Sequence, residues 1–170
     1  MPEPQRTIPA LEGALKRLTL SLLVAVCFCM GVLSADDGWT TYSSRKYGYS
    51  MLIPKGTAMM DKEFGGGWAG AHGEHEGVVF EGITKLGKAT HGEIVEFGIR
   101  YTGVEESRWS KVDSGDGWTV YAVEKGENVL LASVVVGSKA GFLLFLKTTK
   151  SDIHAHKADY EKWYKSVKID

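Results

Sequence analysis

The sequence predicts an α+β fold in which a mostly antiparallel β-sheet is sandwiched between helices. One observation is the stretch 128–147, where two apolar runs of strand length flank the short polar connection 137–141. Glycines at both ends of such a connection are typical of an antiparallel hairpin. The others are two amphipathic segments, which begin near Thr90 and Ser151. Because both faces of the hairpin are apolar, the sheet needs a cover on each side, and these segments supply them.

Residues 1–35 have the layout of a secretory signal peptide. Basic residues precede an apolar stretch at 18–33, and the small residues Ser34 and Ala35 follow it. This stretch is shorter than the ~20 residues that cross a bilayer comfortably, which favours cleavage after Ser34 or Ala35 over a permanent anchor. We therefore expect residues 36–170 to form one domain, with no transmembrane segment after leader removal, in the periplasm or outside the cell.

Both cysteines, Cys27 and Cys29, lie in this leader, so the exported domain has no thiol for a disulfide or a Cys-type zinc site. A lipoprotein anchored through Cys27 is the alternative use, although Val26 stands where a lipobox has a small residue. The formal net charge of the chain is −1, which argues against a nucleic-acid partner, because such surfaces are strongly basic.

The other strands are predicted from short aromatic and β-branched runs bounded by turn residues. Residues 65–77 are rich in glycine and are predicted to form a loop, with Trp68 as a candidate contact residue on the surface. The predicted strands cover residues 39–44, 49–53, 78–85, 107–112 and 118–124.

Each predicted helix has a start signal and an apolar face. Thr90 and Glu93 match a capping box, residues 94, 97 and 101 follow at helical spacing, and Gly103 can end the helix. The second helix is predicted over residues 151–167, with Ser151 as its N-cap. Its buried face carries Ile153, Tyr160, Trp163, Tyr164 and Val167.

Two segments resemble PsbP-like domains. Residues 42–54, YSSRKYGYSMLIP, resemble the opening of these domains, and residues 159–169, DYEKWYKSVKI, resemble their last helix and tail. The resemblance implies an α/β/α sandwich. It also implies a binding or assembly protein rather than an enzyme, since the family includes extrinsic photosystem II subunits, a nuclear-import cofactor and exported bacterial proteins. It carries over no catalytic residue and no photosynthetic role.

The densest group of potential metal ligands comprises His72, Glu74, His75 and Glu76. Imidazole and carboxylate groups suit zinc or a similar divalent ion, and the flexible glycines around them would allow both histidines to converge. The segment lacks the second histidine of a His-Glu-x-x-His motif, because Val79 occupies that position. The alternative is a solvated polar loop that binds no metal.

Two other patterns lack an essential part. Residues 82–88 resemble a P-loop, but Ala89 stands where the magnesium-binding Ser or Thr belongs, and no Gly-x-Ser-x-Gly elbow occurs. The sequence thus favours an exported, non-catalytic protein of the bacterial envelope that binds an envelope protein or a small ligand. The alternative is a metal-binding protein or metal-dependent enzyme that uses residues 72–76.

Overall fold

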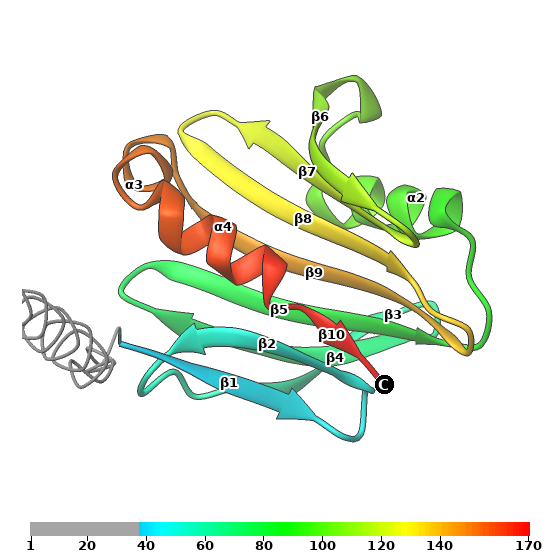
Figure 1. Cartoon of the computed structure of the whole chain (residues 1–170). Helices are drawn as coiled ribbons and strands as arrows, with labels where there is room; N and C mark the ends of the chain where they lie inside the picture. Colours follow the sequence, from blue (N-terminus) through cyan, green and yellow to red (C-terminus); the bar gives the residue numbers. More distant parts are fainter. Residues whose placement is uncertain (1–37) are drawn as a thin grey trace, which may run out of the picture. The chain divides into compact units, whose positions relative to one another are not determined.

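The structure is a computed structural model that describes residues 38–170, so the predictions for residues 1–35, including Cys27 and Cys29, lie outside the described residues. It confirms the α+β class. A seven-stranded antiparallel sheet has the order β3-β4-β5-β9-β8-β7-β6, and a three-stranded sheet has the order β1-β2-β10. Helix α2 covers one face of the large sheet, and α4 with the small sheet lies over the other (Figure 1).

The strands and helices follow one another as a series of hairpins interrupted by α2 and closed by the C-terminal helices. The small sheet comprises β1 (Trp39–Ser44), β2 (Tyr49–Pro54) and β10 (Lys168–Ile169). The large sheet comprises β3 (Met60–Gly65), β4 (Trp68–His75), β5 (Val78–Leu86), β6 (Trp109–Gly115), β7 (Trp118–Lys125), β8 (Asn128–Val136) and β9 (Ala140–Thr149). The helices are α2 (His91–Thr102), the 3-10 turn η1 (Glu106–Arg108), α3 (Lys150–Ala155) and α4 (Lys157–Lys165).

The predicted apolar hairpin forms the centre of the large sheet as β8 and β9. Its alternation has the expected effect: Leu143 and Phe145 of β9 belong to the core beneath α2, whereas Phe142, Leu144 and Leu146 belong to the core beneath α4. Both faces of the hairpin are therefore buried, as a strand pair without a polar face requires.

Helix α2 has the predicted boundaries. The Thr90 hydroxyl accepts a hydrogen bond from the Glu93 N–H, and the Glu93 carboxylate accepts one from the Thr90 N–H, which completes the capping box. Gly103 ends the helix in the left-handed conformation, with φ 64°. Between these caps Ile94 and Phe97 are buried against the sheet, so α2 is the predicted first cover.

The C-terminal segment differs from the single predicted helix. Its N-cap is Thr149 rather than Ser151, because the Thr149 hydroxyl accepts the Asp152 N–H at 3.2 Å. The helix is then interrupted at His156, which lies between α3 and α4. Tyr160 and Trp163 of α4 are buried as predicted, but the chain continues beyond the helix and adds β10 to the edge of β2.

The glycine-rich stretch 65–77 was predicted to be a loop, and this prediction is wrong. Most of it is β4, which pairs with β3 on one side and β5 on the other. Only glycine fits at position 70 of this strand, because a Cβ on Gly70 would lie 1.8 Å from the carbonyl oxygen of Gly82 on β5. Trp68 is not a surface residue either, because it is 4% exposed and stacks on Phe97 with ring centroids 4.2 Å apart.

Candidate functional site

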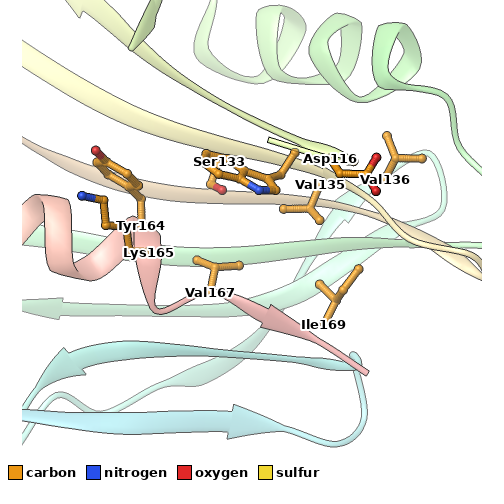
Figure 2. A pocket seen from close by; sticks show the side chains of 10 residues that line it. Asp116, Ser133, Val135, Val136, Tyr164, Lys165, Val167 and Ile169 are labelled. Carbon is orange, nitrogen blue, oxygen red and sulfur yellow. The ribbon is translucent and has the colours of Figure 1, made fainter. Parts of the chain in front are cut away.

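The candidate site is a cleft of about 340 Å³ between the edge of the large sheet and the C-terminal segment. Figure 2 shows Val167 and Ile169 along one wall, Val135 and Ser133 along the other, Tyr164 with Lys165 at one end, and Asp116 with Val136 at the other. Gly117 and Trp118 complete the lining. The walls are largely apolar, and the charged side chains lie at the two ends.

One wall of the cleft exists because α4 stops at Lys165. Ser166, the C-cap, holds the turn with its side chain, which accepts the Leu52 N–H at 2.9 Å and donates to the Trp163 carbonyl at 2.6 Å. The chain then leaves the helix axis and runs along β2 as β10. As a result, Val167 and Ile169 line the cleft where a longer helix would have covered the sheet.

The opposite wall comes from β7 and β8. Trp118 pairs with Val135 in the antiparallel ladder, and the Val136 N–H donates to the Gly117 carbonyl at 2.8 Å. Ser133 and Val135 are two residues apart on β8 and therefore face the same side of the sheet. That side is covered by α4 farther along the strand, where Leu131 is buried, but it is open beside β10.

The polar groups of the cleft differ in their surroundings. Burial raises the pKa of the Tyr164 hydroxyl, and the negative charge of Asp113 adds to this effect, so Tyr164 is a neutral hydrogen-bonding group at pH 7. Lys165 is 59% exposed and its Nζ lies 3.9 Å from a carboxylate oxygen of Glu161. The ammonium has three N–H donors, so this loose ion pair leaves it able to bind an anionic group at its end of the cleft.

The predicted metal ligands lie elsewhere and are divided between two faces. Side chains alternate between the two faces of a strand. His72 and Glu74, two residues apart on β4, therefore share one face, and His75 lies on the other. Glu76 belongs to the β4–β5 turn, with φ 49°. Within residues 38–170, no three His, Cys, Asp or Glu side chains are placed to hold a metal ion together. Metal binding by these residues stays a prediction.

His72 belongs to a hydrogen-bond network around the buried carboxylate of Glu81, beneath α2. Its Nδ1 lies 2.9 Å from Oε1 of Glu81, the residue opposite it on β5. Lys62 Nζ donates to the same oxygen at 2.9 Å, and the Tyr101 hydroxyl lies 2.8 Å from both carboxylate oxygens. The Glu81 side chain is 8% exposed, so three donors compensate for removing its charge from water. This network connects β3, β4, β5 and α2.

On the other face, His75 lines a smaller cavity of about 220 Å³ together with Trp39, Asp152 and His156. Asp152 accepts hydrogen bonds from the Thr148 and Tyr160 hydroxyls, and His156 Nδ1 lies 2.9 Å from its other oxygen. Burial alone would raise the pKa of Asp152, but these hydrogen bonds outweigh it and hold the pKa below its usual value. The network fixes the junction between α3 and α4.

Thermal melts test the metal prediction directly. The chain and its His72→Ala/His75→Ala variant would be melted with zinc, manganese and calcium at pH 7.5 and pH 5.5. We expect no metal-dependent shift in the melting temperature of either protein, because the two imidazoles face opposite sides of β4. A metal that binds only the folded state would add ~2.7 kcal/mol at a hundred times its dissociation constant. Such a gain in the parent alone, shrinking at pH 5.5, would establish the metal site.

Asp152 should make the fold sensitive to acid. Its pKa is lower in the folded chain than in the unfolded chain, so its contribution is present above the unfolded value of ~3.9 and is lost as the pH falls through the folded value. We expect Asp152→Asn to cost about 1 kcal/mol at pH 7, and this difference to shrink between pH 4 and pH 2. Urea unfolding across this range measures it, with Asp159→Asn as the control. A difference that does not change with pH would contradict the account.

Comparison with known proteins relates the chain to other molecules through its structure. No family model matches the sequence, and no curated protein matches it. The solution structure of cyanobacterial PsbP (CyanoP) from Synechocystis sp. PCC 6803 superposes with a TM-score of 0.56 and 19% sequence identity, covering 82% of this chain and 96% of that one. A crystal structure from Bacteroides thetaiotaomicron VPI-5482 has a TM-score of 0.49 and 14% identity, covering 78% of this chain and 49% of that one.

The CyanoP comparison supports the resemblance seen in residues 42–54 and 159–169, since it covers 82% of this chain. None of the helices described for residues 38–170 is long and apolar enough to cross a membrane. The described chain has the PsbP-like α+β fold, a central antiparallel sheet sandwiched between helical covers.

Proposed function

We propose that this chain is an exported, non-catalytic binding or assembly protein of the bacterial envelope, and that it binds its partner through the cleft beside β10. The observation that carries the proposal is the composition of the cleft. Trp118, Val135, Val167 and Ile169 offer apolar surface in a concave site of ~300–1,000 Å³, the size range of sites that bury an apolar group.

The order of the strands also supports binding at this place. Elsewhere on the α4 side, the apolar face of the sheet is covered by α4 or by β1 and β2. These elements together bury the large side chains of the core beneath α4. Beside β10 that cover is incomplete, and Val135 on this face remains partly exposed. A partner that places an apolar group here would bury the part of this apolar face that α4, β1 and β2 leave uncovered.

The envelope location rests on the signal-peptide layout of residues 1–35. Intact-mass analysis of the natively expressed protein should give a chain that starts at Ala35 or Asp36. Acylated Cys27 would indicate a lipoprotein instead, and a full-length chain recovered from the cytoplasm would contradict export.

Capture from envelope extract tests binding through the cleft. Val135→Arg places a charge inside the cleft, and Val112→Arg places one on β6, where Val112 is 51% exposed and does not line the cleft. We expect mass spectrometry to identify a partner that Val112→Arg recovers as well as the parent does, and that Val135→Arg recovers at least tenfold less. A partner set equally abundant on all three proteins would refute the cleft as the binding site.

A further inference from the structure

We infer that the cleft binds the apolar C-terminal tail of a partner protein, which adds to the free edge of β10 as an antiparallel strand with its carboxylate at Lys165. This inference rests on the proposed function and specifies its partner. Three features of the cleft carry it: the free backbone groups of β10, the apolar walls, and the opposite charges at the two ends.

Strand β10 has an unused edge beside the cleft. In the sheet order described for residues 38–170, its one neighbour is β2. Lys168 faces Ser50 in that ladder, and the Asp170 N–H donates to the Gly48 carbonyl at 3.0 Å. Hydrogen-bonded and non-bonded pairs alternate along an antiparallel ladder. The N–H and C=O of Ile169, between these two positions, therefore point away from β2 and are available to another strand.

The apolar walls suit alternate side chains of an extended peptide. Ile169 lies between the free edge and the turn after β8, as its Cδ1 would be 3.1 Å from a Cβ on Gly137. Val167 precedes it by two residues, and both face Val135 across the cleft (Figure 2). A peptide strand directs every second side chain to the same face. Its apolar residues would fill the space between these walls while its backbone pairs with Ile169, as in other cases of strand addition.

The end charges select the direction of the added strand. β10 runs from the Lys165 end toward the Asp116 end (Figure 2). An antiparallel peptide runs the opposite way, so its carboxyl terminus arrives at the ammonium of Lys165. A parallel peptide would instead bring its carboxylate to Asp116, where like charges repel. Charge complementarity thus favours a C-terminal tail in the antiparallel direction over an internal segment, which has no terminal carboxylate to offer.

The test uses a displayed library of random hexapeptides with free C-termini, panned against the full chain and against Val135→Arg in parallel. We expect tails with alternating apolar residues to be enriched on the parent and lost on Val135→Arg. The most enriched peptide is then synthesised as a free acid and as an amide. The acid should bind about fivefold more tightly, and Lys165→Gln should remove this difference. Lys157→Gln, an exposed lysine at the start of α4 outside the cleft, should leave it unchanged.

Two Ile169 variants test the backbone pairing. Ile169→Pro removes the free N–H while the Lys168–Ser50 pair remains, and Ile169→Val keeps the N–H with a smaller side chain. We expect Ile169→Pro to weaken the acid peptide about fivefold more than Ile169→Val does. Equal binding of acid and amide, or equal effects of the two variants, would overturn this inference and leave cleft binding intact. If no tail depends on Val135 while an envelope partner still does, the tail inference fails and the proposed function holds.

Discussion

Trp163→Ala is expected to destabilise the protein by ~3–5 kcal/mol, because it removes the largest fully buried side chain of the core beneath α4. Trp163 is 0% exposed and packs with Tyr49, Met51 and Leu144, which come from both sheets. A typical domain has a stability of only ~5–15 kcal/mol, so this variant should unfold at a much lower urea concentration or fail to fold.

Trp163→Phe is the matched control, since it keeps an aromatic ring in the core. The indole N–H of Trp163 is buried without a hydrogen-bond partner among the described residues, so its removal relieves an unpaired donor. We expect this variant to lose about 1 kcal/mol or less, because the smaller ring leaves a cavity that the relieved donor partly offsets. If urea unfolding gave Trp163→Ala the stability of the parent, α4 would not be docked on the sheet as described.

The second large effect is expected at Glu81. Glu81→Ala leaves Lys62, His72 and Tyr101 without the carboxylate to which all three are hydrogen-bonded. Breaking a buried ion pair costs ~3–5 kcal/mol, but Lys62 is 40% exposed and can regain water, so we expect a loss of about 2–4 kcal/mol. Because the network ties edge strand β3 to the sheet, hydrogen exchange in β3 should also become faster.

Glu74→Ala is the control for Glu81→Ala. Glu74 lies on the neighbouring strand β4 with its side chain in solvent, and changes at such positions usually stay within ±0.5 kcal/mol. The comparison contradicts the account of the network if the two variants have the same free energy of unfolding, or if exchange in β3 is unaffected by the loss of Glu81.

The fold could be predicted from the sequence where the local signals and the tertiary packing agree. The hairpin of β8 and β9 is apolar on both faces, and α2 carries a complete capping box and a glycine stop, so both were predicted correctly. β4 was missed because its glycines respond to contacts that only pairing creates: Gly70 faces the backbone of Gly82 on β5, 1.8 Å from where its Cβ would be. A rule based on local propensity reads the same glycines as a loop.

The cleft was harder to predict than the fold, because its residues come from separate parts of the sequence. Trp118 and Ser133 were assigned to strands, and Tyr164 and Val167 to the buried face of a helix, with nothing to indicate that they meet. The apolar, basic, apolar order of residues 167–169 is the available sign that a strand follows α4. The metal prediction depended on residues close in sequence, but a strand directs His72 and His75 to opposite faces.

Photocrosslinking tests the cleft as a binding site most directly. A benzophenone amino acid in place of Asp116, an exposed residue at one end of the cleft, reports what lies there in the native envelope, and the same residue in place of Val112 reports an exposed position on β6 outside the cleft. We predict one discrete crosslinked partner from position 116 and none from position 112, with the crosslink lost on competition by a peptide that binds the cleft. Identical crosslinks from both positions, or a crosslink at position 112 alone, would contradict the account.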